Sequence, residues 1–164
     1  MKSVKSWSNA ILNWCFVMSP EEIKAFIRRH YEEHNKGKTA IMNEYERSYT
    51  NDIVFHAATG RDLHGINEIK QYMSEFLNAF PDMHFTIDDI FVEGDKVAVR
   101  YTLSGTHKGE LWGVPPTNKK GTMWVIEISH IVGGKVVEVW ARFDTLSFMK
   151  ELGSKFKMTN ITNA

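Results

Sequence analysis

The stretch from Gly133 to Leu146 restricts the fold of this chain more than any other part of the sequence. It opens with two consecutive glycines, which supply the positive φ angles that a tight hairpin turn requires. Apolar and polar residues then alternate with a period of two, a pattern typical of a β-strand whose two faces meet different surroundings. The apolar face holds Val137, Val139, Ala141 and Phe143, and the polar face holds Glu138, Trp140, Arg142 and Asp144. Such a polar face predicts a strand that lines a wet cavity or meets solvent.

A second strand, predicted over residues 122–132, precedes the glycines and is expected to pair with the first one in antiparallel fashion. A register without irregularities places Glu127 opposite Trp140. The same register places Met123 opposite Asp144. The apolar face of this ribbon then holds Trp124, Ile126, Ile128, Val137, Val139 and Phe143. One β-bulge would reverse the two faces over part of the ribbon, and the predicted site depends on this register.

The composition predicts one globular domain without a nucleic-acid partner. Of the 164 residues 43% are apolar and 24% are charged, which suffices for a sizeable core. Lysine plus arginine equals aspartate plus glutamate at 20 each, so the net charge is zero. Proteins that bind nucleic acid gain much of their affinity by neutralising phosphates, and zero net charge argues against this class. It argues against membrane-surface binding for the same reason.

The two ends of the chain differ from its centre. Residues 1–18 carry two lysines and a short apolar patch but no small-residue cleavage site, so we interpret them as an N-terminal extension. Residues 19–153 are expected to form the domain, and residues 154–164 a polar tail. The single cysteine, Cys15, excludes an intrachain disulfide framework and favours a cytoplasmic location.

Three helices are predicted in the first half of the chain. Ser19 and Glu22 have the spacing of a capping box, which predicts a helix over residues 20–34. Thr39 is expected to cap a second helix. A third helix is predicted over residues 65–80, because apolar residues recur there at helical spacing and a proline follows.

The remaining segments predict mainly strands. A short strand over residues 53–57 and a loop over residues 59–62 separate the second and third helices. From residue 83 onward the pattern is strand-like and contains four long strand candidates. Residues 108–120 form a longer connection, and residues 145–152 a short closing helix. The predicted fold class is α+β, with N-terminal helices packed on a curved antiparallel sheet.

A series of motifs, read in order, resembles a known family. The motifs cover residues 35–37, 52–56, 80–82, 93–100, 105–107, 109–111, 113–117, 134–140, 144–146 and 152–153. Their order and spacing resemble the SnoaL-like polyketide cyclase or ester-cyclase family over nearly the whole of residues 19–153. The chain departs from the family's pattern at Asn118, where the loop more often carries glycine, and at His130, where arginine is more common.

The resemblance implies a cone-like α+β barrel of the nuclear-transport-factor type with a pocket between helices and sheet. It implies a homodimer that takes a hydrophobic small molecule. Characterised members of the family close a ring by aldol condensation without a metal or cofactor, and an aspartate serves as acid and base. By motif position Asp144 corresponds to that aspartate. The implied activity is acid/base chemistry on a hydrophobic carbonyl compound, by aldol-type cyclisation or isomerisation.

Asp144 is therefore the first candidate for a catalytic residue. Removing a proton next to a carbonyl needs a base whose pKa approaches the working pH. In the expected register, desolvation beside Trp140 and the charge of Glu127 would raise the pKa of Asp144, while Arg142 would lower it. The alternative interpretation is a surface carboxylate that caps the closing helix.

Other candidate residues carry polar or aromatic groups on predicted strands and loops. His56 is a candidate donor or second acid/base, because it interrupts an apolar run. Arg100 is a candidate for holding a ligand oxygen, and it could instead neutralise Glu127. The further residues expected to contact substrate are Glu127, Trp140, Trp112 and His107.

Three alternatives stay open at the level of sequence. The same fold could be a binding module without chemistry, or an epoxide-hydrolase-like enzyme that uses Glu127, Arg100 and Asp144 to activate water. The apolar ribbon face could also serve chiefly as a dimer surface. His30 and His34 have metal-ligand spacing on one helix, but that helix end is polar and expected to be solvated, so no metal site is predicted.

Overall fold

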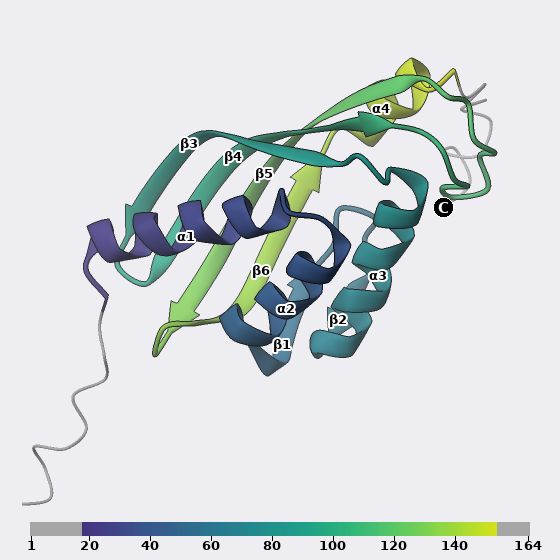
Figure 1. Ribbon diagram of the computed structural model, residues 1–164. Helices are drawn as coiled ribbons and strands as arrows, with labels where there is room; N and C mark the ends of the chain where they lie inside the picture. The colour runs from purple at the N-terminus through teal and green to yellow at the C-terminus, as the bar shows by residue number, and fades with distance from the viewer. Residues whose placement is uncertain (1–17, 154–164) are drawn as a thin grey trace, which may run out of the picture.

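Figure 1 shows a computed structural model of the protein, which describes residues 18–153. Our predictions for Cys15, for most of the N-terminal extension and for the polar tail concern residues outside this range. Among the described residues, no helix is long and apolar enough to cross a membrane. The elements are α1 (Pro20–His34), α2 (Lys38–Ser48), β1 (Tyr49–His56), β2 (Asp62–His64), α3 (Ile66–Ala79), β3 (His84–Glu93), β4 (Lys96–Thr106), β5 (Lys120–Val132), β6 (Lys135–Phe143) and α4 (Thr145–Glu151).

The start of α1 confirms the predicted capping box. The Ser19 hydroxyl accepts a hydrogen bond from the backbone N–H of Glu22, whose carboxylate accepts the backbone N–H of Ser19 at 2.7 Å. At the other end, the Asn35 side chain donates to the carbonyl oxygen of Phe85 and accepts from its N–H, at 2.8 and 2.7 Å. These bonds fix the end of α1 against β3.

The six strands form one sheet in the order β2-β1-β6-β5-β4-β3. Most neighbours are antiparallel, but β1 runs parallel to β6. Figure 1 shows α1, α2 and α3 over one face of this curved sheet. The predicted α+β class, with helices on a curved sheet, is confirmed. We call the face covered by the helices the inner face and the opposite one the outer face.

Three local predictions differ from the structure. The N-cap of α2 is Gly37 with a φ of +99°, and no side chain caps this helix, so the prediction of a Thr39 cap was wrong. The predicted strand over residues 53–57 begins earlier, at Tyr49. The predicted loop over residues 59–62 leads into the short strand β2, which pairs with the end of β1. A three-residue strand is too short to show a period of two in sequence.

The hairpin between β5 and β6 forms at the predicted glycines, whose φ angles are +58° and +77°. Its register, however, contains a bulge. Val132 lies opposite Lys135 as expected, but His130 lies opposite Glu138, and Glu127 therefore lies opposite Ala141 rather than Trp140. The predicted register was wrong from this point on, because the extra residue in β6 shifts every later pair.

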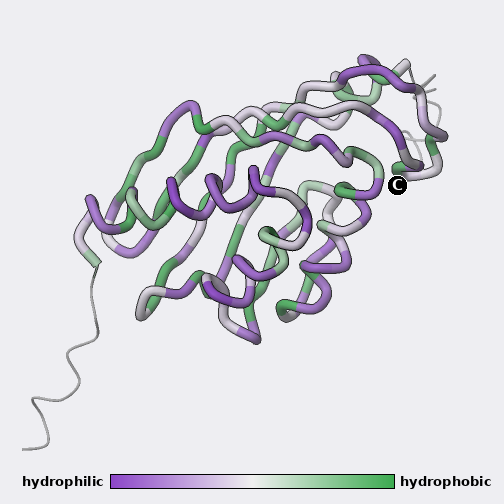
Figure 2. Tube along the Cα trace, in the orientation of Figure 1, coloured by the Kyte–Doolittle hydropathy of each residue, from purple (hydrophilic) through white to green (hydrophobic). Residues whose placement is uncertain are grey.

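This bulge decides which residues of the ribbon point inward. On β5 the inner residues are Met123, Val125, Glu127, Ser129 and Ile131, all buried, while Trp124, Ile126 and Ile128 are 68%, 56% and 40% exposed. On β6 the inner residues near the site are Val139, Ala141 and Phe143. Figure 2 shows the alternation of apolar and polar residues along these strands. The predicted common apolar face does not exist, since Val139 and Phe143 lie on the inner face and Trp124 on the outer.

Candidate active site

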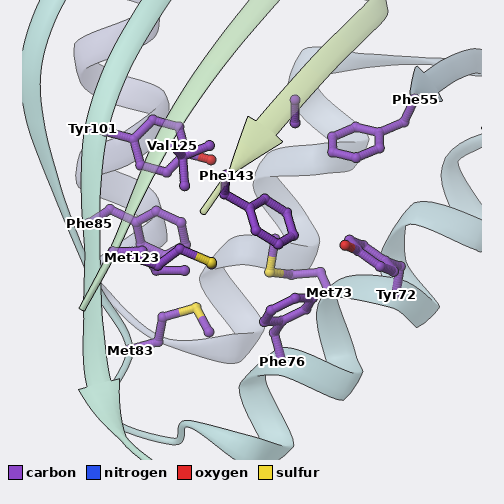
Figure 3. A pocket seen from close by; sticks show the side chains of 12 residues that line it. Phe55, Tyr72, Met73, Phe76, Met83, Phe85, Tyr101, Met123, Val125 and Phe143 are labelled. Atoms are coloured by element: carbon purple, nitrogen blue, oxygen red, sulfur yellow. The ribbon is translucent and has the colours of Figure 1, made fainter. Parts of the chain in front are cut away.

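An apolar cavity lies between α3 and the inner face of the sheet. The space between its lining atoms is about 410 Å³, including solvent at the open mouth. The lining residues are Phe55, Tyr72, Met73, Phe76, Met83, Phe85, Tyr101, Leu103, Met123, Val125, Ala141 and Phe143 (Figure 3). None of these twelve carries a charge, so the cavity suits an uncharged, largely hydrophobic molecule.

Glu127 lies beyond one end of this cavity. It is 7% exposed and follows Val125 on the inner face of β5. Its partner in the register, Ala141, lines the cavity and presents only a methyl group. Tyr101, also a lining residue, donates its hydroxyl to Glu127 Oε2 over 3.5 Å, and Ser129 donates to Oε1 over 3.0 Å.

The surroundings of Glu127 disfavour the charged form of its carboxyl group. Burial raises the pKa of Glu127 above its usual range. The nearby His30 and the hydroxyls of Ser129, Tyr101 and Tyr31 oppose this rise without cancelling it. Sequence reasoning had assigned Glu127 to substrate contact. Of the two candidate carboxyl groups Glu127 and Asp144, Glu127 is the one whose pKa is raised by burial.

A polar cluster between α1, α2 and the sheet adjoins Glu127. His30 Nδ1 lies 3.3 Å from Glu44 Oε1, and the Glu44 carboxylate also accepts hydrogen bonds from Ser48 and Arg47. Burial alone would raise the pKa of Glu44, but the hydrogen bonds of these three partners lower it to about 2. His34 is buried without a partner for either ring nitrogen among the described residues, and burial followed by the nearby His30 lowers its pKa.

The cluster corrects the expectation of a solvated helix end. His30 and His34 are only 4% and 3% exposed, and their rings lie 4.1 Å apart among tyrosine and phenylalanine rings. Residues 18–153 contain no group of three or more His, Cys, Asp or Glu side chains arranged to hold a metal ion.

The structure places Asp144 outside the cavity. It is exposed and forms the N-cap of α4, where its carboxylate accepts the backbone N–H of Ser147 at 2.9 Å. The hydrogen bonds from Ser147 lower its pKa, opposite to the predicted rise. The physical reason is the bulge, which removes Met123 and Glu127 from the face that Asp144 was expected to share. Its geometry matches the alternative interpretation of a helix cap.

His56 and Trp140 also lie on the outer face. The His56 ring stacks on Trp140 with a centroid distance of 5.3 Å and binds two carboxylates, Asp62 at 2.8 Å and Glu138 at 2.9 Å. The hydrogen bond with Glu138, and then that with Asp62, raises the pKa of His56. This group joins β1, β2 and β6 at the surface, away from the cavity.

Arg100 is half exposed on the outer face and donates to Asp89 at 2.6 and 2.8 Å and to Asp88 at 3.3 Å. With Asp144 it borders an open outer hollow that also touches Trp124 and Ile126. Because Glu127 lies on the inner face, the sheet separates the three residues of the epoxide-hydrolase alternative. That arrangement is therefore not formed.

The last two predicted site residues lie near the cavity but do not line it. Trp112 packs beside it, stacked parallel to Phe143 at 6.2 Å and edge-on to Phe76 at 5.3 Å. His107 is fully buried, stacks on Phe80 and pairs with Thr117 at 3.2 Å, so it holds the loop after β4.

The two departures from the family's motifs also fall outside the cavity lining. Asn118 has a φ of +57°, a conformation that glycine adopts without strain and that asparagine tolerates. His130 binds Asp95 at 2.9 Å, where β5 meets the turn before β4. Neither residue alters the apolar lining.

Sequence reasoning missed Tyr101 and Tyr72 as site residues. For Tyr101 a signal existed, since Val97, Val99, Tyr101 and Leu103 alternate with the exposed Arg100 in the same strand. The alternation indicates an inner tyrosine and an outer arginine. The prediction named Arg100 because of its charge and did not name Tyr101. For Tyr72 no comparable signal exists, because it lies beside the apolar stripe of α3.

The curved six-stranded sheet, with helices on its inner face and an apolar cavity between the two layers, defines a cone of the nuclear-transport-factor type. Comparison with solved structures agrees. A protein of Jannaschia sp. CCS1 assigned to the SnoaL-like polyketide cyclases superposes with a TM-score of 0.77 over 84% of this chain and 96% of that chain. At 20% identity this likeness shows the fold alone.

The sequence identifies the family within this class. The family model described as SnoaL-like polyketide cyclase matches residues 25–152. The chain belongs to the SnoaL-like polyketide cyclase family, as its motifs had predicted.

Two relatives come from Streptomyces galilaeus. The aklanonic acid methyl ester cyclase AcmA is 31% identical over an alignment of 123 residues, and the match covers 71% of this chain and 79% of AcmA. The structure of AclR, a candidate hydroxylase, has a TM-score of 0.73 and 29% identity over 82% of this chain and 98% of AclR. Proteins similar to this chain are thus named for different reactions, so its own site decides which reaction it supports.

Proposed function

We propose that this protein performs acid/base chemistry on a hydrophobic carbonyl compound bound in the cavity, by aldol-type cyclisation or isomerisation, with Glu127 as the acid and base. The observation that carries the proposal is the buried Glu127 carboxyl group beside an uncharged cavity, with its pKa raised by burial. Burial shifts the pKa of a carboxyl group upward, toward the working pH, which favours its use as a general base.

The proposed reaction begins with removal of a proton from the substrate. The Glu127 carboxylate accepts a proton from the carbon next to a substrate carbonyl, and the electron pair of the C–H bond becomes part of an enolate. In a cyclisation, the enolate carbon attacks a second carbonyl of the same molecule and forms a C–C bond. The resulting alkoxide takes a proton back from the Glu127 carboxylic acid. In an isomerisation, the proton returns to a different carbon. Ala141, which lines the cavity, lies opposite Glu127 in the sheet register and presents only a methyl group.

Enolate formation is tested by hydrogen exchange in a simple ketone. We expect the wild-type protein to accelerate exchange of the α-protons of 2-tetralone in D₂O, followed by proton NMR. Glu127→Gln keeps the size of the side chain but cannot accept the proton, so the protein-dependent rate should fall by about 100-fold or more. Asp144→Asn is the matched control and should retain the wild-type rate, because Asp144 lies outside the cavity.

The opposite pattern, with exchange lost in Asp144→Asn and kept in Glu127→Gln, would move the chemistry to the outer hollow. A second candidate function is a binding module that holds the same ligand without chemistry. It is favoured by one observation, that Glu127 itself is not among the residues that line the cavity. Ligand binding without exchange in any variant would establish that function instead.

A further inference from the structure

The hydroxyl group of Tyr72 has no hydrogen-bond partner among the residues that the structure describes. Its oxygen is buried, while its side chain lines the cavity. Buried polar atoms in folded proteins nearly always have a hydrogen-bond partner. An exception at the wall of a cavity indicates that the partner is a molecule in the cavity.

The surrounding rings fix the direction of this hydroxyl. The Tyr72 ring packs edge-on to Phe76 at a centroid distance of 5.2 Å and against Phe55 at 6.1 Å. Figure 3 shows the Tyr72 oxygen turned toward the other lining side chains and lying across the cavity from Tyr101. A group held in this way is preorganised to meet a ligand.

Tyr72 can act only as a neutral donor or acceptor near neutral pH. Burial, and then the charge of Glu75, raises its pKa to about 12, so the hydroxyl keeps its proton. The twelve lining side chains include one other oxygen atom, that of Tyr101, which already donates to Glu127. Among the twelve lining side chains, the Tyr72 hydroxyl is therefore the donor that is not bonded to another described residue. It lies on the side of the cavity opposite Tyr101.

We propose that the Tyr72 hydroxyl donates a hydrogen bond to a carbonyl oxygen of the ligand and so determines which end of the molecule faces Glu127. The ligand class is then a hydrophobic compound with an oxygen acceptor at the end of its apolar body that is remote from the reacting carbon. This inference rests on the proposed function in taking the cavity as the ligand site, but it does not depend on the acid/base step.

Two probes of similar shape isolate the carbonyl contact: 2-acetylnaphthalene, which has the oxygen, and 2-ethylnaphthalene, which lacks it. We expect wild type to bind the ketone more tightly. In Tyr72→Phe, which removes only the hydroxyl, the dissociation constant of the ketone should rise about 3- to 10-fold, as for loss of one hydrogen bond, while that of the hydrocarbon stays within about twofold. Met73→Leu changes the same wall without touching a hydroxyl and should preserve the ratio of the two constants.

An infrared measurement detects the hydrogen bond itself, because a change in packing alone would not shift the carbonyl stretching frequency. The carbonyl stretch of the bound ketone should lie at lower frequency in wild type and in Met73→Leu than in Tyr72→Phe. Equal weakening of both probes in Tyr72→Phe, an unchanged carbonyl stretch, or failure of the ketone to bind wild type would overturn the inference. Selective ketone binding together with no proton exchange in 2-tetralone would preserve it and remove the proposed acid/base function.

Discussion

The inner and outer faces of the sheet place chemically similar carboxyl groups in opposite environments. On the inner face, burial raises the pKa of Glu127, and tyrosine and serine hydroxyls surround it. On the outer face, Asp144 is exposed, caps α4, and has a pKa lowered by hydrogen bonds from Ser147. The difference teaches that burial, more than residue type or motif position, indicates which carboxyl group has a raised pKa.

The two faces should differ most in the free energy of unfolding when an aspartate is introduced at either of two adjacent positions of β5. Val125→Asp would bury a charge at the cavity wall, two residues from Glu127, and should lower the free energy of unfolding by about 3–5 kcal/mol. Ile126→Asp, on the 56% exposed neighbour, should change the free energy of unfolding of a single subunit by less than about 0.5 kcal/mol. Urea denaturation of both variants, at concentrations at which sedimentation shows single subunits, measures this. Equal losses would mean that the outer face is also covered within one subunit.

The outer face is also predicted to pair with a second copy of the chain. Trp124, Ile126, Ile128 and the neighbouring Phe91 are 68%, 56%, 40% and 67% exposed, which is a large apolar surface to leave in water. Ile126→Asp should then weaken self-association by about 2 kcal/mol or more, as at a central interface position. Sedimentation over a range of concentrations checks this. A wild-type protein that is monomeric at micromolar concentration would contradict the pairing.

The raised pKa of Glu127 predicts how stability depends on pH. The folded state holds this proton more tightly than the unfolded state. The free energy of unfolding should therefore be highest below the unfolded pKa, about 4.3, and decrease as pH rises through the raised folded value. One proton contributes at most about 1.4 kcal/mol per pH unit. Glu127→Gln should remove this part of the slope in urea denaturation series between pH 4 and 8, and an unchanged slope would show that Glu127 is solvated.

A smaller pH effect is expected from His56 on the outer face. Its hydrogen bonds to Glu138 and Asp62 raise its pKa, so their stabilisation is present below the unfolded pKa, about 6.5, and is lost as pH rises through the folded value. Because both carboxylates are partly exposed, we expect no more than about 1 kcal/mol. His56→Gln should thus be destabilising at pH 5.5 and nearly neutral at pH 8.5. Destabilisation of equal size at both values would indicate that stacking on Trp140 matters more than charge.

Much of the fold could be predicted because its signals are local. The Ser19–Glu22 capping box and the Gly133-Gly134 turn depend on residues that are close in sequence, and the structure confirms both. The family could be predicted because the order of many short motifs is specific even when each one is weak. The Gly37 cap was missed because no side chain caps α2, and the strand β2 was missed because three residues are too few to show a period of two.

The candidate site could be predicted only in part. Glu127 was predicted as a site residue, but Asp144 was expected on the same face of the ribbon. That expectation required a hairpin without a bulge. Val137, the extra residue of the bulge, is an ordinary strand residue, and nothing local distinguishes it from its neighbours. Tyr72 could be placed on α3 from its sequence position, but whether its hydroxyl has a partner depends on side chains from other elements.

The sequence by itself determined the α+β class, the hairpin turn, the first helix cap and the family, because periodicity, glycine turns and motif order are properties of the chain. The tertiary structure alone decided which face of each strand is buried, which carboxyl group adjoins the cavity and which hydroxyl is left unpaired there. The physical reason is that burial and hydrogen-bond partners are set by contacts between distant segments. A single extra residue in β6 is enough to exchange the inside and the outside of the ribbon.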